Sequence, residues 1–147
     1  MPAHINRNAK HPLLVIKKSR LPGAGKGLFT RRAIKKGELV VEYAGRITTW
    51  KAIRENKTFN AYVFYITRNH VIDAKPNKKA PGRYANDAKG IAGIRGVRNN
   101  AEYIVSRGKV FIRAVRNIPT DAEILVDYGK EYWDVIISNT QLEAQKQ

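Results

Sequence analysis

The stretch "RYANDA", residues 83 to 88, sets an arginine, a tyrosine, an asparagine and an aspartate between β-prone, apolar segments. Buried polar side chains cost free energy unless hydrogen bonds satisfy them. These residues alone allow two interpretations. The stretch is either a polar turn capped by Asn86 and Asp87, or a buried segment whose polar groups meet a ligand or the backbone. The segments on either side decide between them.

Short β-prone runs lie on both sides of this stretch, and turn sequences such as "LPGAGKG" (21–27) and "KPNKKAPG" (75–82) separate them. Helix formers gather in "TTWKAIREN" (48–56), where Thr48 or Thr49 is the expected N-cap, and the C-terminal residues predict a second helix. The pattern therefore predicts a mainly β domain with one or two short helices. Its predicted strands are 13–16, 39–43, 62–66, 71–74, 103–105, 110–115 and 124–128.

The composition is that of one globular domain with a strongly basic charge balance. A chain of 147 residues, 43% of them apolar, is long enough to bury a single core. The formal net charge is +16, and residues 1–37 contain ten Lys or Arg and no Asp or Glu. This charge predicts a surface that attracts polyanions, DNA or nucleosomes in particular. Lysines that only keep the protein soluble are the alternative.

Several classes of site and location are disfavoured by what the sequence lacks. It has no cysteine, which excludes disulfides, a thiol nucleophile and cysteine-ligated zinc. Its three histidines share no spacing typical of a metal site, so we expect no metal. No apolar run approaches the roughly 20 residues that span a bilayer, and no secretory signal is recognisable. We therefore expect no membrane partner and an intracellular location, cytoplasmic in a bacterium, or nuclear in a eukaryote or after delivery to a host.

An ordered series of motifs changes the interpretation of "RYANDA". The chain contains "GKGLFTRRAIKKGELVVEYAG" (25–45), then "RYANDA", then "NNAEY" (99–103), then "AEILVDYG" (122–129). Together and in this order they resemble the SET domain of protein lysine methyltransferases. The resemblance covers residues 13–133. It implies a basic N-terminal tail over 1–12, the SET domain over 13–133 and a C-terminal helical tail over 134–147.

The resemblance implies both a fold and an activity. The implied fold is mainly β, with several short-stranded sheets and a C-terminal pseudoknot in which the segment like "RYANDA" is threaded beneath the C-terminal stretch. The implied activity is methyl transfer from S-adenosylmethionine to a lysine side chain of a protein, with a histone as one candidate substrate. The chain resembles small SET proteins that lack the zinc-binding segment found after the domain in many relatives, and we expect it to be a monomer or a homodimer.

Site residues are carried over from the family's motifs. Tyr128 occupies the position of the catalytic tyrosine, and Tyr62 matches a second tyrosine near the cofactor and the lysine channel; for both, packing in an aromatic core is the alternative. The residues implied in cofactor binding are Gly25, Lys26, Gly27, Arg83, Asn86, Asp87, Tyr128, Tyr132 and Trp133. Of these, Tyr132 or Trp133 would stack on the adenine, unless a C-terminal helix packs both against the core.

Three positions depart from the family's pattern. Asp87 stands where most relatives carry His, which brings a carboxylate close to a cationic cofactor. Thirteen residues lie between Asn86 and Asn100, more than the usual short link. Val126 stands where relatives often carry Phe or Tyr, so we expect room for di- or trimethylation unless Tyr65 fills the gap. The altered "RYANDA" segment also leaves an alternative, a catalytically inactive SET-fold module that binds nucleic acid or chromatin.

Overall fold

The computed structural model describes residues 13–56, 60–89 and 96–129. Their strands are β1 (Leu14–Lys18), β2 (Lys26–Thr30), β3 (Leu39–Glu42), β4 (Arg46–Thr48), β5 (Val63–Thr67), β6 (His70–Asp73), β7 (Ala101–Ser106) and β8 (Lys109–Ala114). The α-helix α2 covers Trp50–Glu55, and the 3₁₀ helix η2 covers Pro81–Tyr84.

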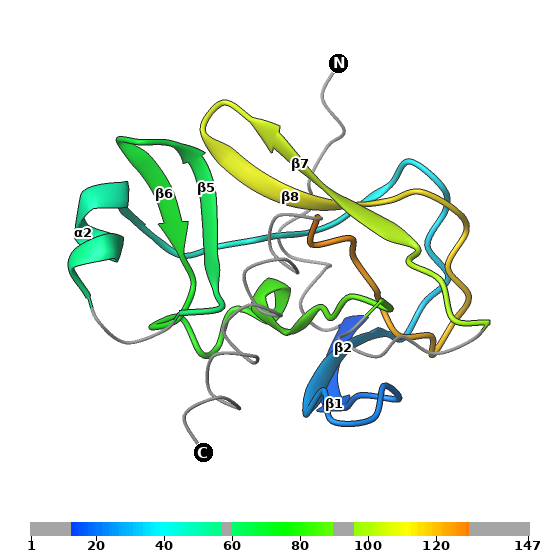
Figure 1. Cartoon of the computed structure of the whole chain (residues 1–147). Helices are drawn as coiled ribbons and strands as arrows, with labels where there is room; N and C mark the ends of the chain where they lie inside the picture. The colour runs from blue at the N-terminus through cyan, green and yellow to red at the C-terminus, as the bar shows by residue number, and fades with distance from the viewer. Residues whose placement is uncertain (1–12, 57–59, 90–95, 130–147) are drawn as a thin grey trace.

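The strands form three small antiparallel sheets, so the prediction of a mainly β fold with several short-stranded sheets is confirmed (Figure 1). One sheet pairs β1 with β2, the second has the order β3-β8-β7, and the third has the order β4-β6-β5. The first six predicted strands match β1, β3, β5, β6, β7 and β8 to within two residues. The list of predicted strands missed β2 and β4. Strand β2 begins inside the glycine-rich stretch that was predicted as a turn, and the three residues of β4 are too few to show an alternating pattern.

The main core lies where the first two sheets meet the C-terminal part of the described chain. Leu28 of β2, Ile112 of β8, and Ile124 and Val126 of the C-terminal segment are fully buried in one cluster. A second cluster joins the second and third sheets and includes Val110 of β8 and Ile72 of β6. Alternation along β8, where Val110, Ile112 and Ala114 are buried, places one face of that strand in the core.

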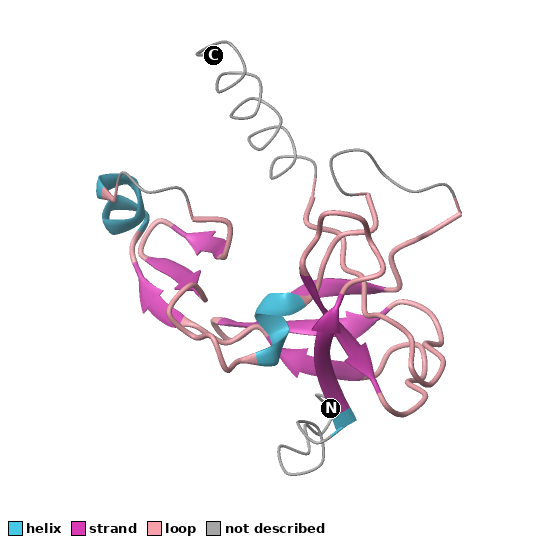
Figure 2. Cartoon of the chain, turned by 90° about the horizontal axis from the view of Figure 1, so that it is seen from below, coloured by secondary structure: helices cyan, strands magenta, loops and turns pink. Residues whose placement is uncertain are grey.

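Helix α2 begins where the sequence predicted. Thr49 is its N-cap, and the Thr49 hydroxyl oxygen accepts a hydrogen bond from the Ala52 N–H at 3.2 Å. No residue of α2 is buried, and Figures 1 and 2 show the helix at the far end of the β5–β6 sheet, away from the main body. The predicted C-terminal helix lies outside the described residues.

The predicted strand at 124–128 is extended but belongs to no sheet. Asn86 and Leu125 form one isolated parallel bridge, and Ala101 and Val126 form another. The Val126 N–H donates to the Asn86 carbonyl at 2.8 Å, while the Ala101 N–H donates to the Leu125 carbonyl at 3.0 Å. The C-terminal stretch thus lies between two segments, one at Asn86 and one at Ala101. This placement of the C-terminal stretch between two earlier segments agrees with the predicted pseudoknot.

Candidate active site

The "RYANDA" segment lies between the turn before β2 and the C-terminal stretch. The Asn86 side-chain N–H donates to the Lys26 carbonyl at 2.9 Å, which ties the segment to β2. The turn itself closes through a hydrogen bond from the Ser19 N–H to the Gly25 carbonyl at 2.8 Å. Gly25 has a φ of 71°, a left-handed conformation that favours glycine. Lys26 and Asn86, 60 residues apart in sequence, therefore meet at this junction.

Glu123 is a buried carboxylate at the same junction, with 6% of its surface exposed. It accepts hydrogen bonds from the Ser19 hydroxyl at 2.6 Å and from the Arg20 N–H at 3.0 Å. A side chain on Gly27 would clash with this carboxylate, so the close approach requires glycine there. Sequence reasoning did not single out Glu123 as a site residue, although it lies within the "AEILVDYG" motif.

We expect Glu123→Gln to lower the free energy of unfolding by about 1–3 kcal/mol, because an amide turns one of the two accepting oxygens into a donor that faces other donors. Urea denaturation measures the change. The control is Glu102→Gln, since the Glu102–Arg113 ion pair is about 40% exposed and surface pairs contribute about 0–1 kcal/mol. Equal losses in the two variants would contradict a structural role specific to Glu123.

Asp87 is buried, and both of its carboxylate oxygens accept hydrogen bonds from the protein. Oδ2 accepts from the Tyr128 N–H at 2.9 Å, and Oδ1 accepts from the Lys89 N–H and the Asn99 side-chain N–H, each at 2.9 Å. The Asn99 side-chain oxygen in turn accepts from the Ala88 N–H at 2.7 Å. Asp87 and Asn99 thereby close the loop between them and hold the backbone of Tyr128. A contact of Asp87 with a cofactor stays a prediction.

Tyr128 is held at two points by the segment that precedes residue 88. Its hydroxyl donates to the Ala85 carbonyl at 2.5 Å, and its N–H donates to Asp87. Its ring is stacked on Tyr103 of β7, with ring centroids 6.4 Å apart and an interplanar angle of 22°. The position and the orientation of this side chain are therefore fixed by contacts from two parts of the chain, the segment of Ala85 and Asp87 and the strand β7.

An aromatic cluster continues from Tyr103 away from Tyr128. The Tyr103 ring makes edge contacts with Phe64 of β5 at 5.2 Å and with Tyr43 at 5.6 Å between centroids. The Tyr43 hydroxyl donates to the carbonyl of Tyr62 at 2.8 Å, which links the cluster to the second predicted tyrosine. Sequence reasoning missed Tyr103 and Phe64, because alternation along a strand does not say which face meets the site.

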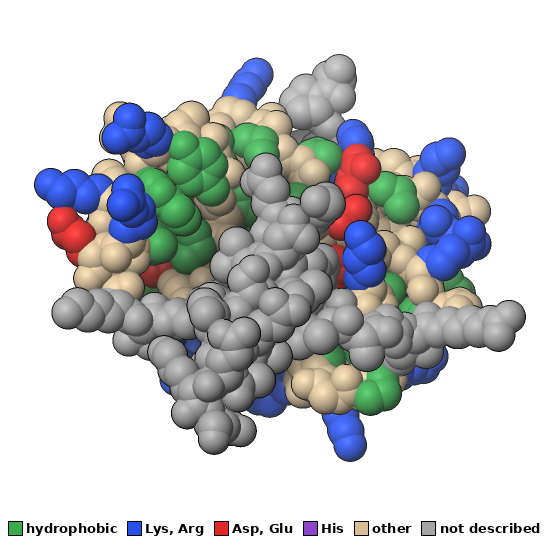
Figure 3. All heavy atoms as spheres, viewed as in Figure 1, with side chains coloured by type: hydrophobic (Ala, Val, Ile, Leu, Met, Phe, Trp, Pro, Cys, Tyr) green, Lys and Arg blue, Asp and Glu red, His purple; other side chains and the backbone are tan. Residues whose placement is uncertain are grey.

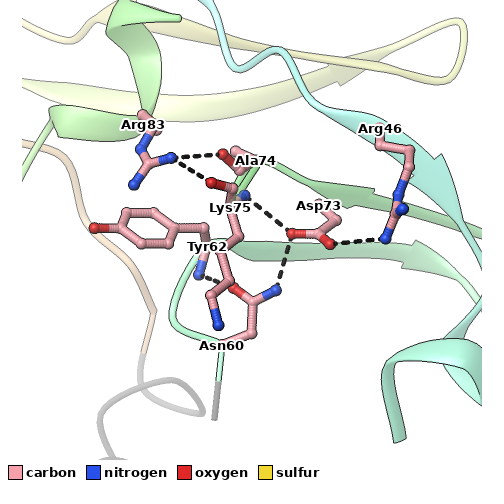
Figure 4. Close-up of polar contacts among 7 residues, drawn as sticks. All are labelled: Arg46, Asn60, Tyr62, Asp73, Ala74, Lys75 and Arg83. Carbon is pink, nitrogen blue, oxygen red and sulfur yellow. Dashed lines mark hydrogen bonds and ion pairs between the residues drawn. The ribbon is translucent and has the colours of Figure 1, made fainter. Parts of the chain in front are cut away.

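Arg83 connects the "RYANDA" segment to Tyr62. Its Nη1 donates to the carbonyls of Ala74 and Lys75 at 3.0 and 2.6 Å, and its guanidinium carbon lies 4.0 Å from the Tyr62 ring centroid (Figure 4). The Arg83 Nε is buried and has no hydrogen-bond partner among the described residues. An unused buried donor of this kind suits an acceptor group of a ligand.

The backbone of Tyr62 is held by a second set of contacts, also drawn in Figure 4. Its N–H donates to the Asn60 side-chain oxygen at 2.9 Å, and the Asn60 amide donates to the buried carboxylate of Asp73 at 2.8 Å. Asp73 also accepts from the Lys75 N–H at 3.0 Å. The loop before β5 is therefore fixed to the end of β6.

The structure does not bring all the predicted residues together. Val126 is fully buried in the main core cluster, two residues before Tyr128. Tyr65 is 49% exposed and makes its ring contact with Trp50 of α2, at 5.4 Å between centroids. Tyr65 thus lies on the face of β5 opposite to Phe64, whose ring contacts Tyr103. The predicted stacking residues at 132 and 133 lie outside the described residues.

Polar groups of "RYANDA" are satisfied mainly by backbone groups. This favours the second interpretation of the stretch, a buried segment whose polar groups meet a ligand or the backbone. The Tyr84 hydroxyl donates to the Lys78 carbonyl at 2.5 Å, and Asn86 and Asp87 make the bonds given above.

Within residues 13–56, 60–89 and 96–129, no group of three metal-ligating side chains lies together. No helix of these residues is long and apolar enough to cross a membrane.

Comparison with known proteins assigns the family. The SET domain family model matches residues 25–129, which is more than half of the chain. The chain belongs to the SET domain family. SET domains bind S-adenosylmethionine, and the family is one of lysine methyltransferases. The match extends from the turn before β2 to the end of the "AEILVDYG" motif, so it includes every described part of the junction around Asn86 and Tyr128 except the Ser19 end of the turn.

Two curated relatives are similar to this SET domain at low identity. One is the "Histone-lysine N-methyltransferase NSD3" of Mus musculus, 41% identical over 59 residues, which are 35% of this chain and 4% of the relative. The other is the "N-lysine methyltransferase KMT5A-A" of Danio rerio, 24% identical over 119 residues, which are 74% of this chain and 33% of the relative. The SET domain thus spans a third or less of the length of these relatives.

Proposed function

We propose that this SET domain is a protein-lysine N-methyltransferase that uses S-adenosylmethionine. The observation that carries the proposal is the junction at which Tyr128, Asn86 and the turn before β2 meet. Hydrogen bonds from Asn86 to Lys26 and from Tyr128 to Ala85 hold these parts together. The family and the printed names of both relatives support the same reaction.

The residues at the junction fit the cofactor. Gly25 has nothing within 4 Å of the place where a side chain would begin, so the turn leaves room for a ligand beside the backbone that leads into Lys26 and Gly27. Asn86 and the unpaired Nε of Arg83 add polar groups nearby. We assign Gly25, Lys26, Gly27 and Asn86 to cofactor binding, with Arg83 beside them. When bound, the cofactor supplies a methyl group on a positively charged sulfur.

The protein's task in methyl transfer is alignment and the exclusion of water, since the amine itself is the nucleophile. We assign the hydroxyl of Tyr128 to orienting the amine and the rings of Tyr62 and Tyr103 to lining the lysine side chain. A lysine has an ordinary pKa of about 10.4, and an apolar channel lowers the pKa of an entering amine by loss of hydration. A neutral amine can therefore form without a dedicated base.

The protein substrate is proposed from the family and from charge. A histone is one candidate, because the printed name of the mouse relative refers to histone lysine. Histone tails are basic, and the chain has a formal net charge of +16, so overall repulsion has to be offset. DNA offers such an offset. We therefore propose DNA or nucleosomes as partners, with binding that weakens steeply as salt is added.

Calorimetric titration with S-adenosylmethionine tests the cofactor site directly. We expect saturable binding by the wild type and binding at least about tenfold weaker in Asn86→Ala, which loses the side-chain bond to Lys26. The control is Asn117→Ala, which removes a bond to the Lys36 N–H on an exposed turn. An absence of binding by the wild type, or equal weakening in both variants, would contradict the assigned site.

A further inference from the structure

The end of the molecule that carries α2 has a hollow of about 760 Å³. Its lining includes Trp50, Lys51, Arg54 and Glu55 of α2, and Arg68 and Asn69 of the turn between β5 and β6. Figure 3 shows Lys and Arg side chains at the end of the molecule where Figure 1 shows α2. We call this surface the α2 basin.

The charge of the α2 basin is positive. Lys51, Arg54 and Arg68 are exposed cations, and Glu55 is the single carboxylate of the lining. The ion pairs among the described residues join other side chains, so none of them neutralises these three cations. Lys51 and Arg54 are three positions apart on α2 and share a face, where like charges repel.

Helix α2 has little support from the rest of the fold, so the repulsion between Lys51 and Arg54 is not offset by burial of the helix. It has six residues, and none of them is buried. Short helices draw most of their stability from packing of an apolar face, which α2 lacks. The Trp50 N–H donates to the Arg68 carbonyl at 2.8 Å, and this bond brings the β5–β6 turn against the start of the helix. Cations from both elements therefore line one hollow.

Two exposed aromatic side chains accompany the cations. Trp50 is 37% exposed and Tyr65 is 49% exposed, and their rings meet edge to face at an angle of 89°. Aromatic rings beside Lys and Arg are typical of surfaces that bind nucleic acids, where cations contact phosphates and rings contact sugars or bases. The cations that line this hollow complement a phosphate backbone in charge.

We propose that the α2 basin binds the phosphate backbone of DNA. Lys51, Arg54 and Arg68 neutralise phosphates, while Trp50 and Tyr65 supply apolar contact area beside them. The basin shares no residue with the junction at Asn86 and Tyr128. The α2 basin is therefore the surface through which the proposed binding to DNA occurs. This binding does not depend on whether the domain transfers methyl groups.

The test is a salt series of binding to a short labelled DNA duplex of arbitrary sequence, followed by fluorescence anisotropy. The basin variant combines Lys51→Gln, Arg54→Gln and Arg68→Gln. The control combines Lys35→Gln, Lys36→Gln and Lys109→Gln, exposed residues outside the basin, and makes the same change in net charge. The single variant Arg68→Gln, outside the helix, reports on the basin without any change to α2.

We expect the slope of log K against log salt to fall by about 2–3 in the basin variant and by about 1 in Arg68→Gln, since each lost phosphate contact removes about 0.9. The control should keep a slope close to that of the wild type. Equal changes in the basin variant and the control would overturn the proposal, because binding would then follow net charge alone. An unchanged slope in the basin variant would also overturn it.

A titration with S-adenosylmethionine separates this proposal from the proposed enzyme. The basin variant should bind the cofactor as the wild type does, because the basin lies outside the junction. If the wild type binds DNA through the basin and does not bind the cofactor, the enzyme proposal fails and the basin remains. If the cofactor binds and the slope is the same in all proteins, the basin fails and the enzyme remains.

Discussion

Tyr128→Phe slows methyl transfer by about a hundredfold or more and leaves the fold and the binding of S-adenosylmethionine in place; this is the result we expect from the geometry of the junction. Phenylalanine keeps the ring that stacks on Tyr103 and removes only the hydroxyl that donates to the Ala85 carbonyl. Loss of one positioned hydrogen-bonding group at a reacting centre reduces kcat by about a hundredfold or more. Transfer of a labelled methyl group to histones or lysine-bearing peptides measures the rate.

The matched control for this variant is Tyr84→Phe. The Tyr84 hydroxyl also donates to a carbonyl at 2.5 Å, that of Lys78, but this bond is exposed and outside the junction. We expect Tyr84→Phe to transfer methyl groups at the rate of the wild type. A Tyr128→Phe protein as active as the wild type would remove Tyr128 from the chemistry. No transfer by any of the three proteins, with DNA binding intact, would favour the catalytically inactive module.

Asp87→Asn should lower the free energy of unfolding by about 2–4 kcal/mol. Among the described residues, the carboxylate accepts hydrogen bonds from the N–H groups of Tyr128 and Lys89 and from the amide of Asn99, which are donors. An asparagine offers one accepting oxygen and places its own amide against a donor, so a buried bond to a charged group is lost and a buried donor is left unsatisfied. Urea denaturation measures the effect.

Asp127→Asn is the control for this substitution, because the Asp127 carboxylate is exposed and accepts a bond from the Gly129 N–H within its own turn. We expect it to change stability by less than about 1 kcal/mol. If Asp87→Asn kept the stability of the wild type and weakened binding of S-adenosylmethionine, Asp87 would act on the cofactor, as the family resemblance first implied. Loss of stability with cofactor affinity retained supports a structural role, in which the Asp87 carboxylate holds the backbone of Tyr128.

Much of the fold was predictable because its signals are local. Short runs of β-branched and aromatic residues predicted six of the strands, and Thr49 before a run of helix formers predicted the start of α2. These features depend on residues within a few positions of one another, where backbone preference and capping act. The order of the motifs, from "GKGLF" to "DYG", was enough to predict the SET domain that the family comparison shows.

The partners of the polar site residues were decided by the tertiary structure alone. Asp87 meets the backbone of Tyr128 across 41 positions, Asn86 meets Lys26 across 60, and Glu123 meets Ser19 across 104. Such pairings arise only when the C-terminal stretch passes between two segments joined by one loop, and no local preference encodes that crossing. For the same reason the sequence proposed Tyr65 for the channel, whereas the fold places Tyr103 against Tyr128. Strand periodicity gives two alternating faces, and only packing between sheets determines which face meets the site.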